Sequence, residues 1–451
     1  MVLITSGGIS KMNALTIFNQ ILIYTIVAYP VIGGLAFIIS SIYYWLFIEK
    51  SDLPQPLKKG TPFISIFIPA HNEEASIEAT IRYLATQMNY PIDCYEMIVI
   101  NDGSTDQTAA ILKRLQAEFP ERLRTLEIVN NRGKAAGFNA ALAFAKGEFI
   151  LSNDADTKPE ADALWKYMYY FERPGGQRLG GVTGNMLSLN KTTLVAQAQH
   201  NELNSIIGLI KRSQLSYGGL FAFSGANTMY RRAAVLDVGG WQAEQPTEDI
   251  AIAWDMQMRG WRIFFAAHIR FFMDVPEKLG ELVKQRQRWS SGGIYVLLTK
   301  TYQVLAHPLK NITLIPIAFD YGLSIVWSVF YWLSVILFVG TQIVLAALQN
   351  WDQIAQNFAF ATVFISIEVI IGVIQLLMSS YFNDQSRSFK YVFFAPWYLI
   401  VLWMVNTYTI TIGLLPTLKK VIAGEDAGSW KSPERSQSVT QTTGKAAKHE
   451  A

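Results

Sequence analysis

Residues 149–156 read FILSNDAD, and this stretch decides which fold the chain is expected to adopt. The run 149–152 is short and apolar, which predicts a buried strand, and Asp154 and Asp156 follow directly after it. Carboxylates so close together can both reach one cation, and a divalent cation there can neutralise a diphosphate leaving group. The alternative is a solvated turn, because a D-x-D pattern alone is a weak signal.

Strand-like and helix-like segments alternate on the N-terminal side of this stretch. The strand-like runs are 63–68, 97–100 and 126–129, and the helix-like segments are 75–87, 108–119 and 135–145. This alternation predicts a mainly parallel sheet with helices on both faces, over roughly residues 60–310. Ligands of such sheets bind beyond the carboxyl ends of the strands, where the polar residues lie here.

The ends of the chain are apolar, whereas its middle has an ordinary mixture of residues. The 451 residues are 51% hydrophobic and only 16% charged, against about 25% charged in soluble proteins. Four apolar blocks are long enough to cross a membrane: 15–48, 312–348, 358–382 and 391–416. Lys50, Lys58 and Lys59 after the first block place the following domain in the cytoplasm by the positive-inside rule.

The C-terminal charges conflict over which side of the membrane holds the tail. Asp352 lies in a loop without Lys or Arg, which suits the outside, whereas Arg387 and Lys390 suit the inside. A third C-terminal span then places the tail outside, although Lys419 and Lys420 favour the cytoplasm. Two alternatives stay open: one block lies in the interface, or one breaks into two short passes.

Other polar residues stand where a donor substrate is expected. Asp102 ends the second strand-like run and can accept a hydrogen bond from a ribose or a base, although Ser104 to Asp106 also suit a helix cap. Glu73 follows the first strand, in a stretch whose backbone can cradle a pyrimidine. Lys134 follows a glycine and supplies positive charge for a phosphate.

Two motifs in the second half of the domain suit catalysis and acceptor binding. Glu248 and Asp249 follow a glycine-rich turn; Asp249 is either a general base or part of an acidic first helical turn capped by Thr247. Residues 285–289 read QRQRW in a basic amphipathic segment, 280–298. This segment is either an interfacial helix or an aromatic face for a sugar with an arginine for a pyrophosphate.

The motifs follow one another as D…DxD…TED…QxxRW, and in this order the chain resembles the processive inverting family-2 glycosyltransferases, the cellulose, chitin and hyaluronan synthases. Residues 182–185 (VTGN), 206–214 (IIGLIKRSQ), 247–253 (TEDIAIA) and 284–293 (KQRQRWSSGG) are similar to the poly-β-1,6-N-acetylglucosamine synthases of bacterial biofilms. The resemblance implies an α/β GT-A (Rossmann-like) cytoplasmic domain combined with α-helical transmembrane segments. Its domains are an N-terminal transmembrane segment (1–50), the glycosyltransferase domain with interfacial helices (51–310), a transmembrane region (311–418) and a polar tail (419–451).

The resemblance also implies a role for each motif residue. Asp249 is the base, with Glu248 beside it, and Asp154 and Asp156 hold the diphosphate and a metal, Mg²⁺ or alternatively Mn²⁺. Lys211 and Arg212 are further candidates, although such residues on a helix more often form a solvated face. The donor is bound by Ala70, Glu73, Asp102, Lys134 and Asp154, and the pyrophosphate and acceptor by Gln285, Arg288 and Trp289.

The implied reaction polymerises N-acetylglucosamine from UDP-GlcNAc onto the 6-hydroxyl of a growing polysaccharide and exports the product through the membrane spans. The implied location is the bacterial inner membrane, as a multi-pass protein in contact with lipid, with a small membrane partner subunit and, in some relatives, cyclic di-GMP control. No nucleic acid partner is expected. Cys94 is the only cysteine, and the sequence has no Cys/His metal spacing, so any metal is expected to be a hard cation held by oxygen ligands.

Several alternatives to this function stay open. Within the same class, the product is hyaluronan, chitin or cellulose, or the acceptor is a lipid. In a different class, the protein is a transporter or receptor whose cytoplasmic domain only binds a nucleotide sugar. Glu368 lies in an apolar block, and it either lines a channel or makes a contact between helices.

Overall fold

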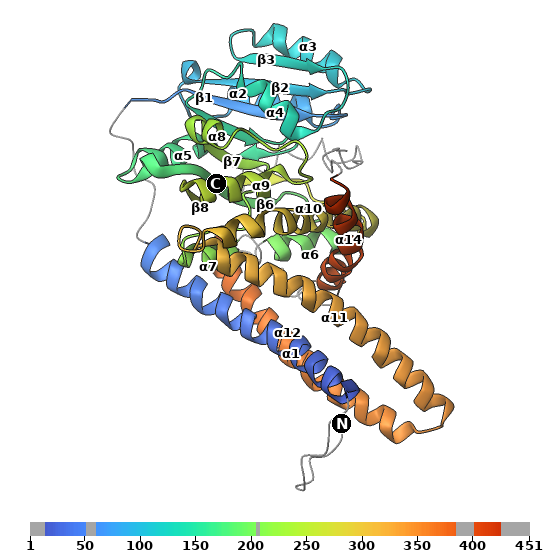
Figure 1. Cartoon of the computed structure of the whole chain (residues 1–451). Helices are drawn as coiled ribbons and strands as arrows, with labels where there is room; N and C mark the ends of the chain where they lie inside the picture. Colours follow the sequence, from blue (N-terminus) through green and yellow to red (C-terminus); the bar gives the residue numbers. More distant parts are fainter. Residues whose placement is uncertain (1–13, 51–59, 204–207, 385–400, 425–451) are drawn as a thin grey trace.

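The computed structural model describes residues 14–50, 60–203, 208–384 and 401–424. An eight-stranded sheet forms the centre of the domain at the top of Figure 1, in the order β3-β2-β1-β4-β7-β6-β8-β5. Its strands are β1 (Ile64–Ala70), β2 (Tyr95–Asp102), β3 (Leu123–Ile128), β4 (Phe149–Asn153), β5 (Lys158–Pro159), β6 (Leu179–Ser188), β7 (Asn227–Arg231) and β8 (Arg262–Met273).

The sheet is mixed rather than mainly parallel. Strands β3, β2, β1 and β4 are parallel, as the alternating pattern predicts, and their carboxyl ends therefore meet at one edge. The later strand β7 runs antiparallel to both β4 and β6, and β5 runs antiparallel to β8. In the second half β6 and β8 are again parallel, so within the described strands the expected parallel pairing is interrupted only at β7 and at the edge strand β5.

Helices of the domain follow the strands and bury their apolar sides against the sheet. In β1 and β2 every residue is buried, as expected of central strands covered on both faces. The covering helices are α2 (Ile77–Thr86), α3 (Thr108–Glu118), α4 (Lys134–Leu142), α5 (Ala163–Glu172), α8 (Arg232–Asp237) and α9 (Glu248–Arg259), with 3₁₀ turns η2 (Ile92–Cys94) and η3 (Gly176–Arg178).

Three further helices lie between the sheet and the apolar helices in Figure 1: α6 (Leu194–Leu203), α7 (Lys211–Ser216) and α10 (Leu279–Ala306). The long helix α10 carries the QRQRW motif and packs against α9, α11 and α14. Its neighbours α6 and α7 contact the sheet strands β6 and β8. The layer therefore connects the strand ends with the apolar part of the molecule.

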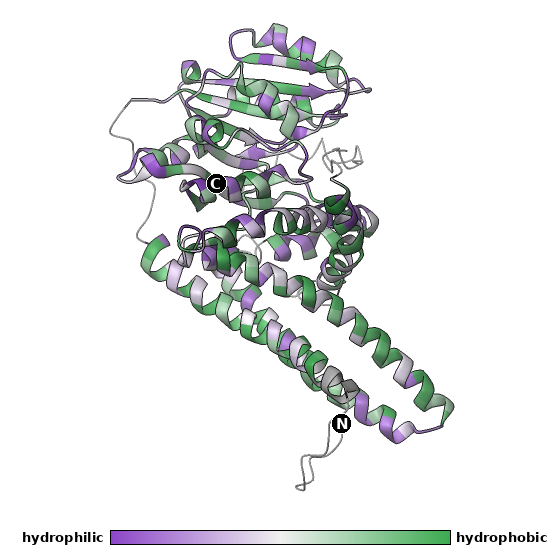
Figure 2. Cartoon of the chain, in the orientation of Figure 1, coloured by the Kyte–Doolittle hydropathy of each residue, from purple (hydrophilic) through white to green (hydrophobic). Residues whose placement is uncertain are grey.

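The apolar blocks form long helices that project away from the sheet: α1 (Ala14–Tyr44), continued by the π-helix η1 (Trp45–Glu49), α11 (Leu314–Ala347) and α12 (Trp351–Asp384). Figure 2 shows that their surfaces are mostly hydrophobic. Within the described residues, three segments are long and apolar enough to cross a membrane: Tyr24–Glu49, Leu314–Ala347 and Trp351–Phe382. The start of α1 and the turn between α11 and α12 lie together at the end away from the sheet (Figure 1).

The last apolar block differs from the other three. Its residues 391–400 lie outside the described residues, and its remainder begins α14 (Trp403–Ala423), which packs along α10 and α11. Helix α14 is not among the three candidate spans of the described chain. This packing favours the alternative in which one block lies in the interface.

Candidate active site

The carboxyl ends of β1 and β4 open into a cavity of about 2440 Å³ that also reaches α9, α10 and the apolar helices. Asp154 and Asp156 follow β4 directly and both line this cavity, as does Glu73 after β1. The Asp156 Oδ1 atom accepts a hydrogen bond from the Thr157 hydroxyl at 3.1 Å. The D-x-D carboxylates therefore face a large cavity rather than open solvent.

Lys134 connects the D-x-D turn with the acidic start of α9. Its ammonium donates to Asp154 Oδ1 at 2.7 Å and to the Gly225 carbonyl at 2.8 Å, and it lies 3.3 Å from Glu248 Oε1. Although burial acts to lower it, the pKa of Lys134 is raised by the carboxylates of Asp154 and Glu248. The lysine is therefore a permanent cation between the two acidic segments.

Gly225 marks the point where these groups converge. A Cβ on this glycine would lie 3.2 Å from the Lys134 ammonium, 3.3 Å from Glu248 Oε1 and 3.4 Å from Asp249 Oδ2. Three charged groups from α4 and α9 thus surround one backbone position that has no side chain. The absence of a side chain lets them approach each other and the cavity.

Asp249 has the properties expected of a general base. It lines the cavity, and its Oδ1 accepts a hydrogen bond from the backbone N–H of Ile250 at 3.0 Å. Burial and the neighbouring Glu248 carboxylate raise the pKa of Asp249 to about 6, while Lys134 and Lys211 oppose the rise. A carboxylate with this pKa is ionised near neutral pH and accepts a proton more readily than an exposed one.

The alternative interpretation of this motif, an acidic first helical turn with Thr247 at the N-cap, is confirmed for the start of α9. Thr247 occupies the N-cap position but makes no side-chain capping hydrogen bond. Its buried hydroxyl oxygen has no partner among the described residues. The acids at the start of α9 still benefit from the helix dipole.

Two of the expected donor-binding residues lie away from the cavity surface. Ala70 is fully buried in β1, and neither Ala70 nor Asp102 lines the cavity. The Asp102 carboxylate instead accepts backbone N–H groups of Arg132 at 2.9 Å and Gly133 at 2.8 Å. It therefore holds the loop that presents Lys134 to the cavity.

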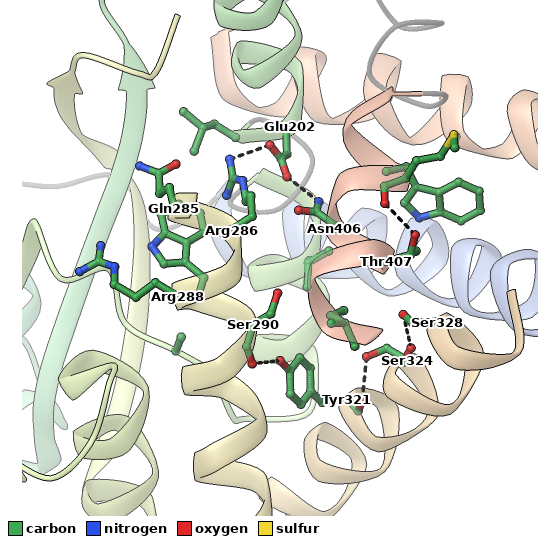
Figure 3. A pocket seen from close by; sticks show the side chains of 18 of the residues that line it. Glu202, Gln285, Arg286, Arg288, Ser290, Tyr321, Ser324, Ser328, Asn406 and Thr407 are labelled. Atoms are coloured by element: carbon green, nitrogen blue, oxygen red, sulfur yellow. Dashed lines mark hydrogen bonds and ion pairs between the residues drawn. The ribbon is translucent and has the colours of Figure 1, made fainter. Parts of the chain in front are cut away.

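On α10, the three expected acceptor residues Gln285, Arg288 and Trp289 all line the cavity. Figure 3 shows Gln285 and Arg288 on the side of α10 away from α14. Trp289 is partly buried, whereas Arg288 is exposed. An indole face together with a guanidinium suits a sugar ring next to a phosphate group.

The cavity continues from this point between the apolar helices. Trp327 of α11 and Trp403 of α14 stack with ring centroids 4.8 Å apart, and both line the cavity. Farther along, the lining includes Glu368, Gln342 and Asn357. For Glu368 this position favours the alternative of a channel-lining residue.

Lys211 and Arg212 are not on a solvated face, so that expectation is wrong. Arg212 has no exposed surface and donates to Glu49 Oε1 at 2.8 Å, which ties α7 to the end of the first apolar helix. Lys211 is 7% exposed, lines the cavity, and has its pKa lowered to about 8 by burial, which the Asp249 carboxylate opposes. Burial of both residues could not be read from a short basic pair in the sequence.

A second group of residues had no assigned role in the sequence. Arg286 lies within the QRQRW motif, but it points away from Arg288 and pairs with Glu202 of α6 at 2.7 Å (Figure 3). Asn406 of α14 donates to the same carboxylate at 2.7 Å. Residues so far apart in the chain give no local pattern that predicts their contact.

A divalent metal fits the D-x-D turn only together with a substrate. In the described part of the chain, no group of three or more His, Cys, Asp or Glu side chains could hold a metal ion. Asp154 and Asp156 supply two oxygen-ligand side chains facing the cavity. Mg²⁺ is usually held by one or two carboxylates together with phosphate oxygens and water, so the residues present fit this mode.

Comparison with known proteins agrees with the motifs. A family model described as glycosyl transferase family 2 matches residues 65–239. A poly-beta-1,6-N-acetyl-D-glucosamine synthase of Staphylococcus epidermidis is 30% identical over 425 residues, which cover 93% of this chain and 98% of the relative. The synthase of the same description from Staphylococcus aureus strain COL is 30% identical over 416 residues, or 90% of this chain and 97% of the relative.

A solved structure agrees with the expected fold. The mannosyltransferase PcManGT from Pyrobaculum calidifontis, in complex with GDP-Man and Mn²⁺, is similar with a TM-score of 0.55. It is 18% identical, and the match covers 81% of this chain and 99% of that chain. At this identity the likeness concerns the fold alone, and it confirms the predicted GT-A type.

Proposed function

The chain belongs to glycosyltransferase family 2, together with relatives described as poly-β-1,6-N-acetyl-D-glucosamine synthases; from this premise we propose that it polymerises N-acetylglucosamine from UDP-GlcNAc into a β-1,6-linked polysaccharide. Its membership in an enzyme family removes the alternative of a transporter or receptor. The choice of UDP-GlcNAc and of the β-1,6 linkage is supported by the descriptions of these relatives. A role in the biofilm matrix is part of the same proposal.

One observation carries the proposal: the groups needed for sugar transfer share a single cavity. Asp249 lies at one wall, Asp154 and Asp156 at another, and Trp289 on α10. Lys134 holds Asp154 at 2.7 Å and Glu248 at 3.3 Å, so the donor side and the base side are connected through one cation. This arrangement suits a diphosphate sugar and an acceptor hydroxyl that meet beside Asp249.

The proposed reaction is a direct displacement. The acceptor 6-hydroxyl attacks the anomeric carbon of the donor while its proton passes to the Asp249 carboxylate. The bond between the anomeric carbon and the diphosphate oxygen breaks, and UDP leaves with that electron pair. One displacement from the opposite face inverts the configuration, so that an α-linked donor yields a β-linked polymer.

The developing charge on UDP needs positive partners. In our proposal Lys134 and Arg288 lie on the diphosphate side, and Asp154 and Asp156 hold a divalent metal. When bound, such a metal neutralises the leaving diphosphate. The mannosyltransferase of similar fold is in complex with Mn²⁺, and we propose Mg²⁺ for this chain with Mn²⁺ as a substitute.

We further propose that the polymer leaves through the continuation of the cavity between α1, α11, α12 and α14. Three helices of sufficient length and apolarity support membrane association. The multi-pass arrangement in a bacterial inner membrane, with the catalytic domain in the cytoplasm, rests on Lys50 and the neighbouring basic residues. A small membrane partner subunit and cyclic di-GMP control stay predictions drawn from the resemblance.

The experiment that tests this function uses membranes that contain the enzyme and individual UDP-sugars. We expect polymer from UDP-GlcNAc only, in the presence of a divalent metal, and complete digestion by a β-1,6-specific hexosaminidase. Digestion by chitinase or hyaluronidase instead would assign the protein to one of the same-class alternatives. Transfer of a single sugar to lipid would contradict the proposed polymerisation.

A further inference from the structure

A buried arginine lies against the tryptophan of the acceptor site. Arg286 precedes Trp289 by three residues on α10, and its guanidinium carbon is 4.1 Å from the centroid of the Trp289 ring. Arg286 and Trp289 both line the cavity, but Arg286 is only 4% exposed, whereas Trp289 is partly exposed. One face of the indole is therefore in contact with a flat cation.

Two residues from other helices fix the position of this arginine. Glu202 of α6 is completely buried, and its Oε2 accepts from Arg286 Nη2 at 2.7 Å. Its Oε1 accepts from Asn406 Nδ2 of α14 at 2.7 Å (Figure 3). Both carboxylate oxygens are therefore used, one by each neighbouring helix.

Helix α14 is also held directly on α10, at residues next to Trp289. The hydroxyls of Ser290 and Thr409 lie 3.0 Å apart, within hydrogen-bonding distance. A Cβ on Gly413 of α14 would lie 3.1 Å from the Ser291 hydroxyl, so the two helices approach closely there. Asn406 therefore belongs to a helix with a fixed position relative to the acceptor site.

We propose that Glu202 and Asn406 are positioning residues for the acceptor sugar, because they fix the Arg286 guanidinium and, through it, the indole plane of Trp289. The ligand is the terminal sugar ring of the growing polysaccharide, which stacks on the cavity side of the indole. This inference rests on the proposed function. Without the carboxylate, the guanidinium can rotate about its flexible side chain, and the indole loses a fixed support.

The burial of these charges agrees with an orienting role. A buried ion pair is seldom more stabilising than apolar residues of the same size, because both charges lose their hydration. A charged and planar group gives something that an aliphatic side chain does not, a directional contact with an aromatic face. We therefore relate the buried Arg286–Glu202 ion pair to the orientation of the Trp289 ring and not to the stability of the fold.

The test compares Arg286→Lys and Glu202→Gln with the unchanged enzyme in membranes supplied with UDP-GlcNAc. In Arg286→Lys the positive charge beside Glu202 is kept, but the planar guanidinium is lost. In Glu202→Gln the shape of the side chain is kept, but its negative charge is lost. We expect each variant to keep its KM for UDP-GlcNAc and its protease resistance, but to transfer sugar roughly tenfold more slowly, within the ~10²-fold loss of rate that a 1 Å misplacement can cost, and to make shorter polymer. The share of donor that is hydrolysed rather than transferred should rise.

The matched control is Glu49→Gln, which weakens the buried Glu49–Arg212 ion pair outside the cavity lining. We expect this variant to make full-length polymer per folded molecule, even where its thermal stability falls. Normal polymer length in Arg286→Lys, or equal shortening in Glu202→Gln and Glu49→Gln, would overturn the inference. Failure of the unchanged enzyme to make polymer from UDP-GlcNAc would instead contradict the proposed function.

Discussion

Gly292 of α10 packs against Thr247, the residue just before Glu248 and Asp249, so closely that a Cβ on Gly292 would overlap the threonine side chain. The next residue, Gly293, is equally close to the ring of Tyr321 in α11. The helix that carries Trp289 is therefore in direct contact with the segment that carries the proposed base, Asp249, and with an apolar helix. The distance between the proposed base and the proposed acceptor site therefore depends on the close approach at Gly292.

Gly292→Ala should reduce polymer synthesis strongly, because the new methyl group must push Thr247 and the start of α9 away from α10. We expect a fall in kcat of roughly 10–10²-fold, as for a catalytic group displaced by about 1 Å. Gly280→Ala is the control, because nothing lies within 4 Å of a Cβ at that exposed position of the same helix. The measurement is turnover as UDP release. Equal turnover in the two variants would contradict the view that packing at Gly292 positions the start of α9.

Asp249→Asn should leave UDP affinity nearly unchanged and reduce turnover by roughly 10²–10⁴-fold, the usual contribution of a general base. In the unchanged enzyme kcat/KM should rise with pH through about 6, because the base works only when Asp249 is ionised. This acidic limb should disappear in the variant. Asp255→Asn, on the same helix but outside the cavity lining, is the control. An equal loss of UDP binding in Asp249→Asn would indicate a structural role instead.

Lys211→Met should move the acidic limb of the pH profile to higher pH. The positive charge of Lys211 acts to lower the pKa of Asp249, so its removal leaves burial and Glu248 less opposed. Activity at pH 6 should therefore fall more than activity at pH 7.5. Lys284→Met, at an exposed position outside the cavity lining, should leave the profile unchanged. An unshifted limb in Lys211→Met would show that Lys211 does not act on the base.

Asp156→Ala should abolish polymer synthesis and remove the metal dependence of UDP binding, because the diphosphate would lose its divalent counter-ion. The measurement is UDP affinity with Mg²⁺ and after chelation, together with polymer yield. Asp162→Ala is the control, since Asp162 pairs with Lys166 and does not line the cavity. Normal polymer from Asp156→Ala with the metal chelated would contradict the assignment of this residue to a metal site.

The parts of the fold that could be predicted are those that depend on residues close together in the sequence. The strands that precede Glu73, Asp102 and Asp154 were recognisable because each is a short apolar run closed by polar residues. The antiparallel strand β7 and its pairing with β4 were not predicted, since pairing between distant segments leaves no periodic signal. The same reason applies to α14, whose packing along α10 is a tertiary contact.

The candidate site could be predicted in part. Asp154, Asp156, Asp249 and Trp289 belong to motifs, and the structure brings them to one cavity. Glu202 and Asn406 are separated from Arg286 by 84 and 120 residues along the chain, and an isolated acid or amide in a helix gives no sign of its partner. Asp102 ends its strand as expected. Its carboxylate, however, accepts backbone hydrogen bonds from the loop before Lys134, and residue types alone do not specify the geometry of that turn.

Trp289→Ala should still bind UDP and hydrolyse its donor slowly, but it should make little or no long polymer. The indole offers an apolar face to the C–H surface of a sugar ring and one N–H donor for a hydroxyl. Alanine removes both, so the terminal sugar should dissociate before the next transfer. Trp289→Phe should keep part of the activity, since a ring still faces the cavity and contacts the Arg286 guanidinium.

The competing view of Trp289 is an anchor at the membrane interface, where tryptophan is common. This view predicts that Trp289→Ala inserts or folds poorly, and that every correctly inserted molecule makes polymer of normal length. The site predicts normal insertion with short product, because the ring lines the cavity and rests on a buried cation. Tyr302→Ala is the control, since Tyr302 is an aromatic residue on the same helix that is 81% exposed and lies outside this cavity. Polymer length per inserted molecule decides between the two views: normal length in Trp289→Ala would remove the residue from the acceptor site.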